Sequence, residues 1–187
     1  MNALRTLRNA AITLIATASI ASAQAGILSN AATVSINATK PASLTITINS
    51  GASQTLASLT DNAVNSFAAP VNITTAWDIN PSASAVVLVG YFATPAQALA
   101  NGSDFIASSL VKGRLGAAGA FNPFTGAAVG SVGVAGGSLT LFSQAITGAN
   151  KRANRTDDLF LQIDLTGQPA VTAGTYAGTL NLRAITQ

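Results

Sequence analysis

Few side chains in this sequence are of the types that carry out catalysis. The 187 residues include nine Lys and Arg and six acids, all of them Asp, and there is no Cys, His or Glu. A Ser-His-Asp triad is impossible without His, and zinc sites of the usual kind and the commonest general bases are excluded as well. These absences predict a protein that is not an enzyme and that uses no cofactor.

One spacing matches a catalytic pattern. Ser109-Leu110-Val111-Lys112 fits S-x-x-K, in which a helix brings a Lys amine to a nucleophilic Ser. The match lies in an apolar stretch, 105–111, that reads as a strand, and residues three apart on a strand face opposite ways. The companion S-D-N and K-T-G motifs are also missing. We therefore expect no catalytic residues here.

Residues 151–158 form the single charged cluster. Asp157 and Asp158 are adjacent and could offer oxygen ligands to calcium, but no EF-hand spacing accompanies them. Arg152 and Arg155 are close enough in sequence to pair with these acids instead. The cluster is predicted to be a solvated loop of ion pairs, and no metal site is expected.

Residues 113–137 hold eight of the sixteen glycines, which predicts a long loop or loose hairpin. Phe121 and Phe124 lie inside this stretch, where no alternation accounts for their burial. We therefore predict that these two aromatic residues form a contact loop.

The first 25 residues have the parts of a secretory signal peptide. Arg5 and Arg8 form a positive flank, and the apolar run at 10–21 is too short to span a bilayer. Overlapping A-x-A sites predict cleavage after Ala23 or Ala25. Residues 26–187 would then be a single secreted or cell-surface domain without a membrane span.

Loss of the signal leaves seven basic residues against six acids, a net charge of +1. That balance is not the footprint of a nucleic-acid-binding protein. Charged residues make up only 8% of the chain, so small neutral polar groups should cover its surface. Such a surface repels neighbouring molecules weakly, which suits assembly.

Period-two alternation indicates the elements of the fold. It predicts strands at 33–38, 44–48, 71–79, 139–146, 159–165 and 175–184. The continuous apolar run Ala85 to Phe92 predicts a strand covered on both sides, paired with the strand at 71–79, and residues 95–100 predict one short helix. Seven or eight short strands with hardly any helix indicate an all-β protein, an immunoglobulin-like antiparallel β-sandwich of Greek-key type.

The sequence AGTYAGTLNL at 173–182 resembles the closing strand of bacterial pilin-type and other surface immunoglobulin-like domains, which commonly end on AGTYxGTLxL. The whole plan is similar to that of archaic chaperone–usher pilins of the spore-coat-U-like group. The resemblance implies a subunit that lacks one strand and receives its neighbour's N-terminal extension. Those pilins usually carry a disulfide between early strands, whereas this chain has no Cys.

Residues 31–40 would be the donor segment under this resemblance. Thr33, Val34, Ile36 and Ala38 are its assembly strand, and Pro41 sets it off from the following strand because proline cannot donate to a ladder. The implied partners are further copies of the chain, joined by strand exchange, and a periplasmic chaperone and usher.

The sequence thus favours a non-enzymatic structural subunit of a surface filament, fimbria or coat. A monomeric secreted module that binds a carbohydrate or another surface ligand through loops, including Phe121 and Phe124, stays open as an alternative.

Overall fold

The computed structural model describes residues 30–80 and 82–187. The predicted signal peptide lies outside the described residues. The chain divides after Thr39 into two units, each considered by itself. In the first unit, residues 30–39 have no helix or strand, and their side chains are exposed, with Val34 83% and Ile36 88% accessible. The predicted strand at 33–38 is therefore not formed in this structure.

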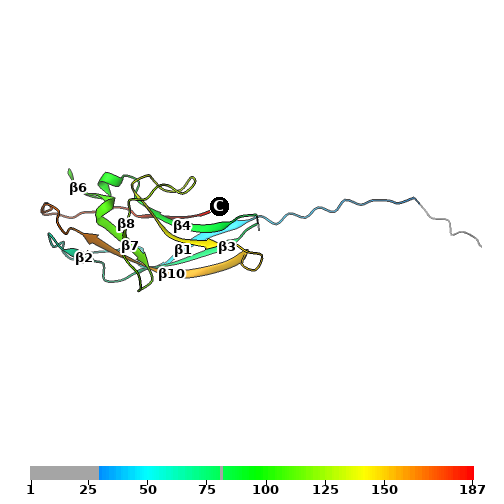
Figure 1. Cartoon of the computed structure of the whole chain (residues 1–187), viewed down its shortest axis with the longest axis horizontal. Helices are drawn as coiled ribbons and strands as arrows, with labels where there is room; N and C mark the ends of the chain where they lie inside the picture. The colour runs from blue at the N-terminus through cyan, green and yellow to red at the C-terminus, as the bar shows by residue number, and fades with distance from the viewer. Residues whose placement is uncertain (1–29, 81) are drawn as a thin grey trace, which may run out of the picture. The chain divides into compact units, whose positions relative to one another are not determined.

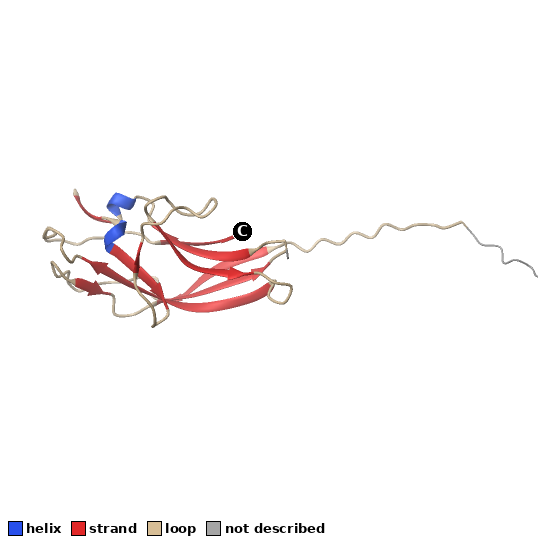
Figure 2. Ribbon diagram, in the orientation of Figure 1, coloured by secondary structure: helices blue, strands red, loops and turns tan. Residues whose placement is uncertain are grey.

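The second unit, residues 40–187, is all-β with antiparallel sheets (Figure 2). Its longer strands are β1 (Ser43–Ser50), β3 (Val71–Asp78), β4 (Ala85–Tyr91), β7 (Val111–Leu115), β9 (Ser138–Ala145), β10 (Arg152–Asp164) and β11 (Asn181–Thr186). Its shorter elements are β2 (Val64–Ser66), β5 (Leu99–Asn101), β6 (Asp104–Ile106), β8 (Asn122–Pro123) and the 3₁₀-helices η1 (Pro95–Gln97) and η2 (Ser108–Leu110). Within the described residues, no helix is both long and apolar enough to cross a membrane.

Two main sheets build this unit (Figure 1). One has the order β1-β3-β10-β7-β8, with β2 added to β10, and the other has the order β11-β4-β9. The prediction that β4 pairs with the strand at 71–79 is wrong, because β3 already has β1 on one edge and β10 on the other. β4 pairs with β11 and β9 instead.

The core lies where the alternating faces of both sheets meet. Ile73 and Trp77 of β3 are buried in the same apolar cluster as Val86 and Leu88 of β4. The opposite face of β4 is also covered, because Val132 of the glycine-rich stretch packs against Val87 and Val89. The prediction of a strand buried on both faces is thus confirmed.

Two predicted boundaries are wrong. β10 begins at Arg152, so most of the charged cluster expected as a loop is strand. Its charges are tolerated there because Arg155 is held by both oxygens of Asp157, at 2.7 and 2.6 Å, and its guanidinium lies 4.1 Å from the centre of the Phe142 ring. The expected strand at 105–111 is instead β6, the helix η2 and the start of β7.

Candidate functional site

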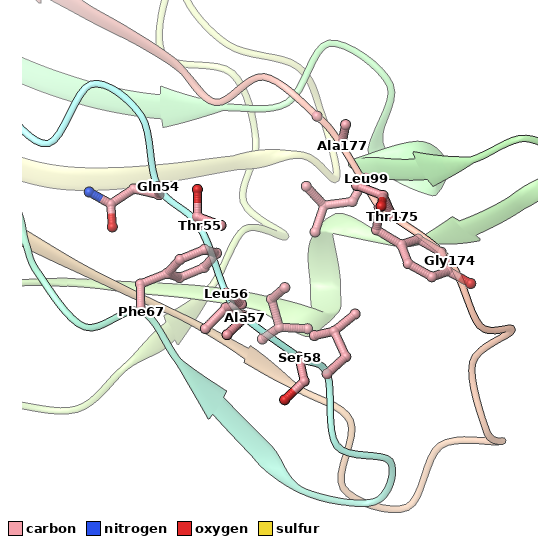
Figure 3. A pocket seen from close by; sticks show the side chains of 14 residues that line it. Gln54, Thr55, Leu56, Ala57, Ser58, Phe67, Leu99, Gly174, Thr175 and Ala177 are labelled. Atoms are coloured by element: carbon pink, nitrogen blue, oxygen red, sulfur yellow. The ribbon is translucent and has the colours of Figure 1, made fainter.

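A groove runs between two chain segments that belong to neither sheet. Residues 51–59, which follow β1, form one wall, and residues 174–180, which lead into β11, form most of the other (Figure 3). Two adjoining cavities, of about 390 and about 250 Å³, make up the groove and share Gln54, Phe67, Leu99 and Gly178 among their lining residues. We name it the assembly groove, after the role that we propose for it; its floor is apolar and its walls are irregular segments.

The first wall exists because β1 ends in a distortion. The pairing of β1 with β3 shifts between Ile48 and Ser50, and the next residue, Gly51, has φ +76°. A side chain at Gly51 would lie 2.5 Å from the carbonyl oxygen of Pro70. Glycine therefore permits the chain to leave the sheet here, and residues 51–59 run on without strand pairing.

The second wall is the first half of the AGTYAGTLNL motif. Ala177 exchanges two backbone hydrogen bonds with Ala100, at 2.8 and 3.0 Å, and Tyr176 lies half-buried along the groove. Gly178 packs so closely on the backbone of Ala98 that no side chain fits at this position. The predicted strand at 175–184 is a strand only from Asn181, because the residues before it have no continuous neighbour in a sheet.

The floor of the groove is apolar. It is formed by side chains from several elements: Phe67, Phe92, Leu99, Val111, Leu161 and Ile163. No Lys, Arg or Asp lines the groove in the described structure. Such a site offers no charged acid or base for catalysis, but it can accept alternate apolar side chains of an extended peptide.

Beyond the groove, β1 and β11 are the edge strands of their sheets, and they approach each other. The amide of Ile79 donates to the carbonyl of Lys151, so by alternation the even-numbered residues of β3 direct their backbone groups toward β1. The residues of β1 opposite them, Ser43, Thr45 and Thr47, therefore direct their backbone N–H and C=O groups toward β3. Backbone groups of Leu44, Ile46 and Ile48 consequently point to the free edge.

The same reasoning applies to β11. Gln187 and Ala85 exchange backbone hydrogen bonds of 2.9 and 3.2 Å, so alternation directs the backbone groups of Leu182 and Ala184 away from β4. Two rows of unpaired backbone groups thus border the region that the groove opens into. An additional strand is the structural element that would satisfy both rows.

The structure separates Phe121 from Phe124. The Phe124 side chain is 0% exposed and meets Phe92 edge-on, with ring centres 5.2 Å apart, so it belongs to the core rather than to an exposed contact loop. Phe121 is half-buried and lies against the guanidinium of Arg114, 4.4 Å from its ring centre. Neither ring lines the assembly groove.

The residues of the chemical patterns are likewise held in structural contacts. Ser109 is exposed in η2, and the Nζ of Lys112 donates to Asp164 at 2.6 Å. That hydrogen bond, followed by those from Thr166, lowers the pKa of Asp164 from 3.8 to about 2. Asp158 accepts a hydrogen bond of 2.6 Å from Asn72. The part of the chain that the structure describes contains no group of three metal-ligating side chains.

Comparisons with known proteins leave the groove as the main guide to function. No protein-family model, no curated protein and no solved structure matches this chain.

Sequence reasoning missed the wall at 51–59. A signal was present, because Gly51 follows an alternating strand directly and Leu56 and Leu59 are apolar residues in a stretch without strand periodicity. Such a stretch has to run along an apolar surface outside a sheet, and both leucines pack against the core.

Proposed function

We propose that this protein is a non-enzymatic structural subunit of a surface filament, fimbria or coat, which polymerises by β-strand addition. The donor is the segment 33–38 of one copy, and the acceptor is the assembly groove, with the free edges of β1 and β11, of another copy. The observation that carries the proposal is the presence of an apolar groove whose two walls lack a strand between them.

The donor segment has the chemistry that this groove requires. Val34, Ile36 and Ala38 alternate with Ser35 and Asn37, so one face of an extended segment is apolar and the other polar. Val34 and Ile36 are among the most exposed large apolar side chains of the described residues. Their burial in a groove would stabilise a complex by about 1.5–3 kcal/mol for each side chain.

The fold class proposed with this function is an immunoglobulin-like sandwich with Greek-key connections. Two antiparallel sheets that share one core and cross over between β3 and β4 support it. The residues of the signal-peptide pattern support export, and the mature protein would act at the cell surface.

Assembly in this scheme has a physical barrier. β1 and β11 approach each other beyond the groove, so an incoming strand has to part them before it can pair with both. We expect the donor to enter at the open cavities and then pair toward Leu44. A periplasmic chaperone that keeps the edges apart, and an usher, would accelerate this step.

Substitutions in the donor segment test the proposal. The variant Val34→Asp/Ile36→Asp places two carboxylates against an apolar floor, where burying an unpaired charge is strongly unfavourable. We expect loss of polymers in size-exclusion chromatography and electron microscopy, with export and subunit stability unchanged. The matched control is Ser35→Asp/Asn37→Asp, which changes the polar face of the same segment and should still polymerise.

Wild-type-like polymers from Val34→Asp/Ile36→Asp would contradict the donor assignment. A wild-type mature protein that stays monomeric at high concentration, with no polymers on the producing cells, would contradict assembly itself and favour the secreted binding module.

A further inference from the structure

The turn that joins β5 to β6 begins with the sequence Asn-Gly. The strand register pairs Asn101 with Asp104, so Gly102 and Ser103 form the loop of this hairpin. Gly102 is exposed and has φ +61°, and no other group lies within 4 Å of the position that a β-carbon would occupy. Asn-Gly occurs at no other position in the sequence. The turn therefore places one asparagine next to a backbone amide that no side chain shields.

The groups of this turn that could react are weakly held. The Nδ2 of Asn101 donates one hydrogen bond, to the carbonyl oxygen of Ala173 at 3.5 Å, which is longer than a typical N–H···O bond. Within the described residues, the amide of Gly102 donates to no backbone acceptor. The Nδ2 of Asn49, in contrast, is held within β1 by two hydrogen bonds of 2.7 and 2.8 Å. Asn101 therefore keeps more rotational freedom than an asparagine in a paired strand.

We propose that Asn101 is a site of spontaneous deamidation, and that this modification loosens the 174–180 wall of the assembly groove. Asparagine is a thermolabile residue. The nitrogen of Gly102 gives up its proton and forms a bond to Cγ of Asn101, and the bond from Cγ to Nδ2 breaks with release of ammonia. Water then opens the resulting cyclic imide at either carbonyl carbon, which gives aspartate or isoaspartate. The net reaction consumes one water and releases one ammonia, so it needs no oxidant or cofactor.

The Asn101 side chain connects the hairpin to the wall of the groove. Its amide bonds to Ala173 and leaves no room for a side chain at Gly174. The preceding residue, Ala100, exchanges two backbone hydrogen bonds with Ala177. These contacts tie β5 to the segment that leads into β11, so a chemical change at residue 101 acts directly on this wall.

Both products of the reaction weaken these contacts. A carboxylate cannot donate a hydrogen bond, so its oxygens would face the carbonyl oxygen of Ala173 without a proton between them. The new charge would also lie opposite Asp104 in the hairpin, and like charges in such cross-strand positions are destabilising. Isoaspartate in addition lengthens the backbone by one carbon and disturbs the register of β5 and β6. The hydrogen bonds between Ala100 and Ala177 should consequently open more often.

The consequence for assembly rests on the proposed function. A wall that opens more often is a less preorganised acceptor for a donor strand, so modified subunits should assemble less. Subunits that stay unassembled would in this way lose their capacity for assembly with age.

Incubation of the mature wild-type protein in mildly alkaline buffer, followed by peptide mass spectrometry, tests the modification. We expect the mass increase of an amide-to-acid conversion at Asn101 before any other asparagine. Its rate should rise with pH, because the attacking nitrogen has to lose its proton. Asn49, which precedes Ser50 in β1, is the internal control and should stay unmodified over the same period. Gly102→Ala shields the attacking nitrogen and places its side chain in open space, so it should slow the reaction several-fold.

The variant Asn101→Asp reproduces one product and tests the effect on the wall. Hydrogen exchange at the amides of Ala100 and Ala177 should lose protection, while exchange within β4 stays as in the wild type. The yield of polymers should fall. Asn154→Asp is the matched control, because it adds the same charge at an exposed position that does not line the groove. It should change neither the exchange of these amides nor the polymer yield.

The measurements separate this inference from the proposed function. No mass increase at Asn101, or an equal increase at Asn49, would overturn the modification site. Unchanged exchange at Ala177 in Asn101→Asp would overturn the link to the wall, whether or not the protein polymerises. Lost protection with a wild-type yield of polymers would overturn the consequence for assembly. Lost protection in a protein whose wild type never polymerises would support the effect on the wall and contradict the proposed function.

Discussion

β4 and β1 are strands of similar length and neither contains a charged residue, yet they differ completely in burial. The five central residues of β4, from Val86 to Gly90, are buried, whereas no residue of β1 is. β4 has a hydrogen-bonded neighbour on each side and apolar cover on each face, but β1 has only β3 beside it. The difference follows from the residue types, continuously apolar in β4 and alternating with Ser, Thr and Asn in β1, and from the neighbours of each strand.

β1 is an edge strand that lacks the usual protection against pairing with another strand. Soluble proteins usually protect edge strands with charges, prolines or very short strands. β1 has none of these between Ser43 and Ser50, and Lys40 and Pro41 stand just before it. An edge without such protection is open to the addition of another strand, and for this reason the assembly that we propose uses the edges of β1 and β11.

The largest effect on stability is expected in the buried core beside β4, which we call the closed centre. Phe124→Ala should lower the free energy of unfolding by about 3–5 kcal/mol, because it empties a fully buried site. The ring lies where a side chain at Gly90 or Gly113 would come within 2.9 or 3.2 Å of it, so these glycines make its space. Urea unfolding of the mature variant measures the loss. Phe121→Ala is the matched control and should cost about 1 kcal/mol or less.

An equal loss of unfolding free energy in Phe124→Ala and Phe121→Ala would contradict the assignment of Phe124 to the core and of Phe121 to the loop. A loss confined to Phe121→Ala would mean that Phe124 is not part of the centre at all.

A smaller effect is expected at the groove. Gly178→Ala places a methyl group against the backbone of Ala98, so the wall has to shift, at a cost of about 1–3 kcal/mol. The shift changes the shape of the groove, so polymer yield in electron microscopy should fall even though the subunit stays folded. Gly148→Ala is the control, because nothing lies within 4 Å of its added carbon and its stability should change by about 0.5 kcal/mol or less. Unchanged assembly by Gly178→Ala would remove this wall from the acceptor site.

Sequence periodicity predicted the elements whose side chains alternate against the core. The predicted strands at 44–48, 71–79 and 139–146 correspond to β1, β3 and β9 to within two residues at each end. Alternation reports which face of a strand is apolar, and the buried position of Trp77 beside Ile73 follows from it. It does not report which strand lies alongside, and for that reason the pairing of β4 was predicted wrongly.

The remaining errors have two physical sources. The start of β10 was hidden because a charged run was taken to need solvent, whereas Arg155 and Asp157 neutralise each other within the strand. The burial of Phe124 was hidden because room for its ring is made by Gly90 of β4 together with Gly113, and no alternation links these two positions to Phe124. Only the first wall of the groove, residues 51–59, lacks periodicity; the second wall, residues 174–180, alternates but has no continuous neighbour in a sheet, so alternation predicted a strand there and not a wall.

The smallest expected effect concerns acid. Lys112 of β7 and Asp164 of β10 form an ion pair between two neighbouring strands, with side chains 28% and 19% exposed. Lys40 pairs with Asp78 just before the free edge strand β1, and its side chain is 69% exposed. The hydrogen bond from Lys112 lowers the pKa of Asp164 from 3.8 to about 2, so in the folded protein this carboxylate loses its charge only near the lower value.

The Asp164 carboxylate therefore contributes fully to stability above its pKa in the unfolded chain, and this contribution is lost as the pH falls from about 4 to about 2. Lys112→Gln removes the main cause of the shift, so the difference in unfolding midpoint between wild type and variant should be constant above pH 4 and shrink below it. Urea unfolding at a series of pH values measures this difference.

Lys40→Gln is the control. The hydrogen bond from Lys40 lowers the pKa of Asp78, and this substitution weakens it. Its difference should be smaller, because solvent screens this exposed pair. A larger acid effect from Lys40→Gln would mean that the free edge, and not the closed centre, depends more on its charges.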